Sequence, residues 1–92
     1  MQDIIVKYEK LKDEEHEFTF GYVSDNVIMI NEILNEKQQR VVEAKLLGFI
    51  KLYQAQLKNF SLTMHETNPK LLKIEEKLNK FAQEYLKHKE IE

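Results

Sequence analysis

The apolar positions in the second half of the chain recur at helical spacing. Between residues 41 and 64 one apolar set advances in steps of three or four, namely Val42, Leu46, Phe49, Tyr53, Leu57, Phe60 and Met64. That spacing is typical of one face of an α-helix. A second apolar set lies on another side of the same helix, namely Val41, Ala44, Gly48, Leu52, Ala55 and Leu62. A helix that is apolar on two sides lies between two partners, and we expect one of them to come from a second subunit.

Polar residues mark the starts of the helices. Asn35 is followed by Gln38 three positions later, which is a capping-box pattern and indicates a helix that begins near Asn35. Ser24 is another candidate N-cap, so residues 24–65 form either one helix or two, and we favour a break near Asn35. Asn68 followed by Pro69 predicts the start of the last helix. These signals predict a long antiparallel helical hairpin over residues 36–66 and 69–89.

The first part of the chain has a weaker pattern. Ile4, Ile5, Tyr8 and Leu11 fall on one helical face after Asp3, which predicts a helix over residues 3–12, with a strand as the alternative. Residues 18–23 alternate aromatic side chains, which predicts a short extended segment. That segment either lays its aromatics on the helical core or pairs with residues 4–9 as a hairpin. The expected fold is an all-α bundle of three or four helices, in a single domain over residues 1–92.

Composition narrows the classes of protein that the chain can belong to. Of its 92 residues, 42% are apolar and 33% charged, which excludes a disordered chain, and two Gly with one Pro disfavour a many-stranded fold. The absence of Cys excludes disulfides, thiolate metal sites and Cys nucleophiles. The longest apolar run is Val27–Ile30, far too short to span a bilayer, and Met1–Asp3 has no basic stretch typical of a signal peptide. We therefore expect a soluble, cytoplasmic protein.

Candidate catalytic and metal-binding patterns are missing from the sequence. No two of the three histidines (His16, His65 and His88) are three or four residues apart, and there is no Glu-x-x-His motif. There is no glycine-rich phosphate loop, and Arg40 is the single arginine. We therefore expect no catalytic residues, no metal and no cofactor, and a protein that is not an enzyme.

Charge is distributed unevenly and points to a protein partner. Residues 13–36 contain seven acidic side chains and no Lys or Arg, and they surround the aromatic residues Phe18, Phe20 and Tyr22. Aromatic anchors are typical of interface hot spots. The small residues Ala44, Gly48 and Ala55 permit close approach of another helix, which favours a homodimer. The predicted function is a small non-enzymatic protein-interaction or regulatory module, of the size of antitoxins, immunity proteins, chaperones or phage-type inhibitors.

The alternative function is nucleic-acid binding through the last helix. Five lysines fall within an arc of about 120° at 100° per residue, namely Lys70, Lys73, Lys77, Lys80 and Lys87. Such a stripe can contact phosphates. Lysine contributes point charges, however, and the near absence of arginine removes the usual reader of bases. Nucleic-acid binding is therefore the less favoured of the two predicted functions.

Overall fold

The protein has an α+β fold of one four-stranded mixed sheet and two helices. The computed structural model describes residues 3–11, 19–53, 58–63 and 68–91. The elements are β1 (Ile5–Glu9), β2 (Thr19–Ser24), β3 (Val27–Asn31), α1 (Glu36–Tyr53), β4 (Asn59–Thr63) and α2 (Pro69–Ile91). The expectation of an all-α bundle of three or four helices is therefore wrong.

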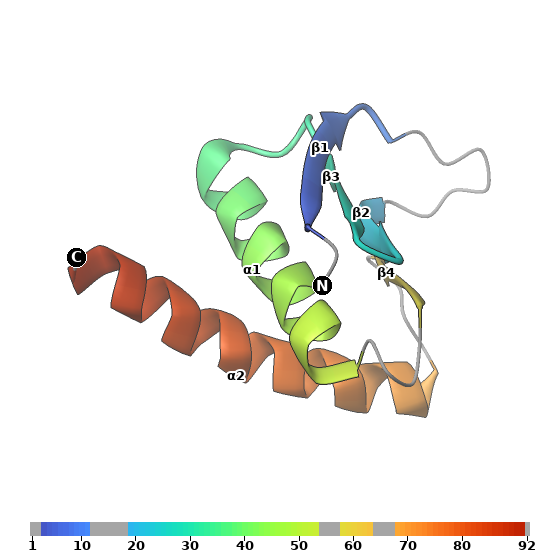
Figure 1. Ribbon diagram of the computed structural model, residues 1–92, viewed down its shortest axis with the longest axis vertical. Coiled ribbons are helices and arrows are strands. Elements are labelled where there is room, and N and C mark those ends of the chain that lie inside the picture. The colour runs from blue at the N-terminus through green and yellow to red at the C-terminus, as the bar shows by residue number, and fades with distance from the viewer. Residues whose placement is uncertain (1–2, 12–18, 54–57, 64–67, 92) are drawn as a thin grey trace.

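The sheet has the strand order β1-β3-β2-β4. The central strand β3 pairs in parallel with β1 and antiparallel with β2, and β2 pairs antiparallel with β4. In Figure 1, α1 lies along one face of the sheet and α2 crosses α1 near its C-terminal end. Within the described residues neither helix covers the opposite face of the sheet, although Met29 of β3 is buried there. The strands β1 and β4 form the two edges of the sheet.

The N-terminal segment is a strand, so the predicted helix over residues 3–12 is wrong and its alternative is confirmed. Ile5, Val6 and Tyr8 are β-branched or aromatic and suit a pleated surface better than a short exposed helix. The extended segment predicted over residues 18–23 is confirmed from Thr19 onward as part of β2, and Phe18 lies outside the described residues. The alternative in which this segment pairs with residues 4–9 as a hairpin is wrong, because β3 lies between β1 and β2 in the sheet.

Ser24 is not a helix N-cap, because it is the last residue of a strand and a tight turn follows it. Ser24 ends β2, and Asp25 and Asn26 form the tight turn into β3. Asp25 has a φ of 53°, in the left-handed region that Asp tolerates better than most residues. The apolar run that follows is buried on both faces of the sheet. It therefore lacks the alternation of apolar and polar residues that predicts a half-buried strand.

The long helix expected over residues 36–66 ends at Tyr53, and β4 follows it. Phe60 and Leu62 are buried, whereas Asn59 and Ser61 between and beside them are exposed. The segment therefore has the period of two that a half-buried strand requires. Its apolar residues happen to continue the helical spacing of α1, which is why the sequence predicted one helix.

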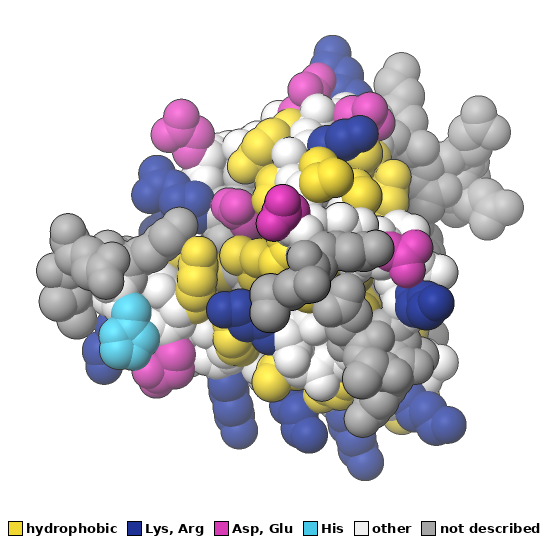
Figure 2. Space-filling view, viewed as in Figure 1, with side chains coloured by type: hydrophobic (Ala, Val, Ile, Leu, Met, Phe, Trp, Pro, Cys, Tyr) yellow, Lys and Arg dark blue, Asp and Glu magenta, His cyan; other side chains and the backbone are white. Residues whose placement is uncertain are grey.

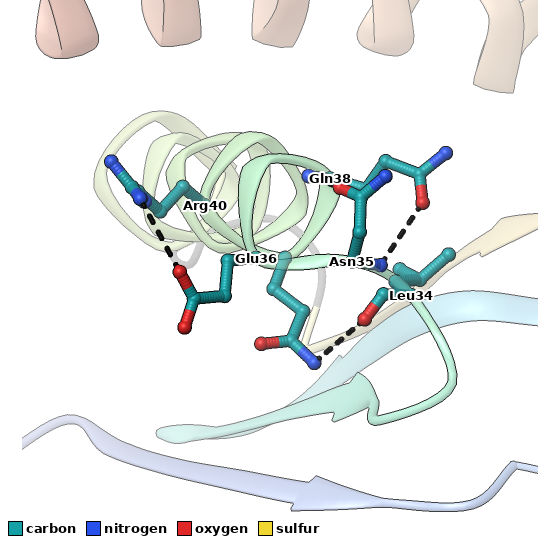
Figure 3. A network of polar contacts seen from close by, with 6 residues as sticks. Leu34, Asn35, Glu36, Gln38 and Arg40 are labelled. Atoms are coloured by element: carbon teal, nitrogen blue, oxygen red, sulfur yellow. Dashed lines mark hydrogen bonds and ion pairs between the residues drawn. The ribbon is translucent and has the colours of Figure 1, made fainter.

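The predicted helix starts at Asn35 and Asn68 are confirmed. The Gln38 amide donates to the Asn35 side chain over 2.8 Å, and the Asn35 amide donates to Gln38 Oε1 over 3.2 Å. Gln39 adds a bond from its side chain to the Leu34 carbonyl, so the first turn of α1 is fixed on the sheet (Figure 3). At α2, the Lys70 amide donates to Asn68 Oδ1 over 3.0 Å. The capping residues were therefore a better guide than the apolar spacing.

Both apolar sides of α1 make contacts within the chain, although Leu52 on the second side is 51% exposed. One side faces the sheet, where a Cβ on Gly21 would lie 2.9 Å from Val42 Cγ1 and 2.7 Å from the Met29 carbonyl oxygen. The other side faces α2, where a Cβ on Gly48 would lie 2.6 Å from the ring of Phe81. A second subunit is therefore not needed to explain the two-sided pattern. Among the described residues, neither α1 nor α2 is long and apolar enough to cross a membrane.

Candidate interaction groove

An apolar groove lies between the first half of α1, the β2–β4 end of the sheet and the start of α2. Its volume is about 270 Å³. The residues that line it are Phe20, Val41, Val42, Leu62, Lys37, Gln38, Lys45 and Glu75. Four of these side chains are apolar and three are charged, so the groove combines an apolar floor with an ionic rim.

A β-bulge brings Phe20 into the groove. Thr19 pairs with Thr63 and Gly21 pairs with Leu62, so the register between β2 and β4 shifts by one residue at Phe20. Strict alternation would place Phe20 on the uncovered face of the sheet together with Tyr22. The bulge resets the alternation, and Phe20 lies on the same side as α1.

One wall of the groove is a regular row of side chains on α1. Lys37, Val41 and Lys45 are four residues apart and therefore lie on one face of the helix. Gln38 also lines the groove, and its capping-box bonds to Asn35 hold this end of the wall in place. The spacing places one ammonium group on each side of the apolar Val41.

The charges at the rim favour an anionic ligand. Across the described ranges, the ion pair within 4.0 Å joins Arg40 to Glu36 at 3.9 Å, and neither residue lines the groove (Figure 3). Lys37 and Lys45 are therefore left without a carboxylate at that distance in this part of the chain. Glu75, on α2, supplies one negative charge against their two positive charges. A ligand with an apolar group and a nearby carboxylate is the best complement to this arrangement.

The structure places the predicted partner-binding residues in different surroundings. Phe20 lines the groove, whereas Tyr22 is half-buried on the opposite face, opposite Met29 of β3 and Ser61 of β4. Ala44 and Gly48 are buried, and the close approach that Gly48 permits is made by α2 of the same chain. Phe18 and Ala55 lie outside the described residues. Of the predicted set, Phe20 is therefore the residue that belongs to the groove.

Sequence reasoning did not single out Lys37, Lys45 and Glu75 as site residues. The regular Lys37–Val41–Lys45 spacing was visible, but it is equally typical of the border between the buried and solvated sides of a helix. Glu75 enters the groove through the packing of α2, which the sequence does not reveal. The sequence signal that could have indicated the bulge is Gly21, directly after Phe20, because a glycine inside a strand often marks a bulge.

The predicted lysine stripe lies on the outer side of α2. All five of its members are exposed, namely Lys70, Lys73, Lys77, Lys80 and Lys87. Figure 2 shows a row of basic side chains that projects from α2 along the lower edge of the molecule. Glu84 falls inside the same arc of the helix and lowers the positive charge near its C-terminal end. The stripe and the groove are thus separate surfaces with different chemistry.

No group of three or more His, Asp or Glu side chains that could hold a metal ion is present within residues 3–11, 19–53, 58–63 and 68–91. His88 is exposed on α2, and the other two histidines lie outside the described ranges. Comparisons of the chain with protein-family models, with curated proteins and with solved structures find no match.

Proposed function

We propose that the chain is a non-enzymatic protein-binding module that holds a short segment of another protein in the groove. The observation that carries this proposal is the apolar floor of Phe20, Val41 and Leu62 between two lysines, next to the edge strand β4. An enzyme would need convergent reactive side chains, whereas the groove offers apolar contact and fixed charge. The regulatory classes expected from size, and the cytoplasmic location, stay predictions.

The arrangement favours an extended segment as the ligand. Within the described residues β4 has one neighbour in the sheet, β2, so its other side offers backbone donors and acceptors to a further strand. Strand addition of this kind uses backbone bonds for affinity and a pocket beside the strand for specificity. We infer that the ligand places one large apolar side chain against Phe20 and Leu62, and a carboxylate near Lys37 or Lys45.

The expected affinity is modest. Burial of one leucine- or phenylalanine-sized side chain contributes about 1.5–3 kcal/mol. Exposed ion pairs contribute about 0.2–1 kcal/mol each, and association itself costs several kcal/mol. The ligand must therefore combine the apolar anchor with strand pairing along β4, and a single amino acid or a short fatty acid is expected to bind weakly.

Selection of random displayed peptides on the immobilised protein tests this proposal. The wild-type protein is expected to enrich peptides that carry a large apolar residue next to Asp or Glu. The Lys37→Glu/Lys45→Glu variant reverses the charge on both sides of Val41, so its selected peptides are expected to carry Lys or Arg beside the apolar residue.

A variant with the same change in net charge provides the control. Lys51 and Lys87 are exposed and do not line the groove, so Lys51→Glu/Lys87→Glu is expected to keep the preference for acidic flanks. Identical peptide sets from the wild-type protein and from Lys37→Glu/Lys45→Glu would contradict the proposal, as would selected peptides that lack an apolar residue.

The second candidate function, nucleic-acid binding, is favoured by the exposed stripe on α2. Lys70, Lys73 and Lys77 lie about one helical turn apart, at a rise of about 5.4 Å per turn, and project to solvent. Such a row can contact successive phosphates without reading bases. Protein binding is the better supported proposal, because the stripe is also the ordinary solvated side of an amphipathic helix.

Binding of a random-sequence DNA duplex at several salt concentrations tests the second candidate. If the stripe binds phosphates, Lys73→Glu/Lys77→Glu is expected to weaken binding and to reduce the slope of log K against log salt by about 2. The groove variant Lys37→Glu/Lys45→Glu has the same charge and should bind DNA more strongly than the stripe variant. Equal binding by the two variants would show that net charge alone is responsible.

A further inference from the structure

Within the described residues β1 forms an edge of the sheet, and exposed apolar side chains lie in the strand and directly before it. Its neighbour in the sheet is β3, and in Figure 1 it is the strand nearest the viewer. Ile4, Ile5 and Tyr8 are 38%, 45% and 47% exposed. An edge strand with apolar side chains is a ready template for pairing with another strand. This edge is therefore a candidate site for pairing with a strand of another chain.

The backbone bonds to β3 determine which groups of β1 point outward. The Ile5 amide donates to the Asn26 carbonyl, and the Glu9 carbonyl accepts from the Glu32 amide, so Ile5 and Glu9 face the inside of the sheet. Along a strand, successive residues direct their backbone amide and carbonyl groups to opposite sides of the strand. The amides and carbonyls of Val6 and Tyr8 therefore point to the free edge, where they can bond to another strand.

We propose that two copies of the chain pair through β1, antiparallel, with Tyr8 at the two-fold axis. In this register Tyr8 faces Tyr8 of the second copy, and Val6 faces Lys10 of the second copy, as hydrogen-bonded pairs. Lys7 then faces Glu9 of the second copy, and the symmetry repeats this pair on the other side of the axis. The two sheets join into one continuous sheet.

Charge selects this register over its neighbours. A shift of the axis from Tyr8 to Lys7 would place Lys7 opposite Lys7 of the second copy, and a shift to Glu9 would place the two Glu9 side chains opposite each other. Like charges directly opposite each other destabilise a strand pair, whereas opposite charges stabilise it. With the axis at Tyr8, both cross-strand ion pairs are favourable, so the sequence Lys7–Tyr8–Glu9 is complementary to itself.

The other edge strand, β4, has no charges that would be complementary to a second copy of itself. β4 carries Asn59, Ser61 and Thr63 on the uncovered face and has no charged residue within the strand. Pairing of β1 with β4 of another copy would also leave one edge free at each end and produce an open chain of copies. A β1–β1 pair closes after two copies, and it leaves the groove free because β4 lies at the opposite edge of the sheet.

Sedimentation equilibrium of the wild-type chain and of charge variants tests the proposal. The wild-type protein is expected to have the mass of two chains. Lys7→Glu and Glu9→Lys each place like charges opposite each other twice, so each alone should weaken dimerisation about tenfold or more. An equimolar mixture of the two variants restores both opposite-charge pairs, and so does the double variant Lys7→Glu/Glu9→Lys, so both should again be dimeric.

Two further variants complete the experiment. Lys10→Glu changes a charge that faces Val6 of the second copy and should leave the dimer unchanged. Tyr8→Pro removes an outward amide, which an edge strand tolerates, and should give a folded single chain by circular dichroism. A single-chain mass for the wild type at every concentration would overturn the proposal, as would a dimer that Lys7→Glu and Glu9→Lys leave intact. Failure of the double variant to regain the dimer would overturn the register.

Discussion

Replacement of Phe49 by alanine is expected to lower the free energy of unfolding by about 3–5 kcal/mol. Phe49 is 1% exposed and belongs to the core cluster between α1 and the sheet. Its ring stacks on Phe60 of β4 at a centroid distance of 4.8 Å and on Tyr53 at 5.7 Å. The substitution removes these contacts and leaves a cavity that the rigid sheet cannot fill. Denaturation by urea, followed by circular dichroism, measures the loss.

Leu52 provides the matched control on the same helix. It is 51% exposed, so Leu52→Ala is expected to change the free energy of unfolding by about 0.5 kcal/mol or less. A loss below about 1 kcal/mol for Phe49→Ala would contradict the burial of the Phe49 ring in the core.

The stacking of Phe49 on Phe60 also distinguishes the strand β4 from a continued helix. In a single helix these residues would lie about 16 Å apart along the axis and could not touch. A double-mutant cycle with Phe49→Leu and Phe60→Leu is therefore expected to give a coupling energy of about 0.5–1.5 kcal/mol. Zero coupling would favour the continuous helix that the apolar spacing suggested.

Replacement of Asn31 by alanine is expected to cost about 3 kcal/mol, because it leaves several backbone groups without partners. Asn31 is fully buried at the end of the central strand. Its Nδ2 donates to the Thr19 carbonyl over 2.9 Å and to the Leu11 carbonyl over 3.3 Å, and its Oδ1 accepts from the Leu11 and Ile33 amides. One side chain thus joins the end of β1, the start of β2 and the turn after β3.

Thermal unfolding and amide hydrogen exchange measure this effect. Exchange at Leu11 and Ile33 is expected to become faster in Asn31→Ala, because their amides lose their acceptor. Asn26→Ala is the control, since the side chain of the half-buried Asn26 makes one bond within the described residues, to the Asp3 carbonyl, and should lose about 1 kcal/mol or less. Equal losses for the two substitutions would contradict a special role for Asn31.

The elements that sequence reasoning identified correctly are those with local chemical signals. Asn35 with Gln38, and Asn68 with Pro69, satisfy or remove backbone donors within a few residues, so their effect does not depend on the rest of the fold. The strands that the sequence did not predict are those whose formation depends on pairing within the folded sheet. β3 is buried on both faces and so does not alternate, and Phe60 fits a helical spacing as well as a strand.

The groove was predictable only in part for the same reason. Phe20 was chosen for its aromatic side chain, but its position against α1 depends on the bulge between Thr19 and Gly21. The lysines that flank Val41 are ordinary helix-surface residues until β4 and α2 are placed beside them. Asn31 carried no signal at all, because its partners come from three segments that meet only in the folded sheet.

The most direct measurement of the proposed function is amide chemical-shift mapping with the peptide that the wild-type protein selects. Large shifts are expected at the groove residues Phe20, Val41, Lys45 and Leu62 and along β4, with small shifts on the outer side of α2. The same titration of Lys37→Glu/Lys45→Glu should give much smaller shifts at these positions. Shifts that cluster instead at Lys73 and Lys77, or that do not change in the variant, would contradict protein binding through the groove.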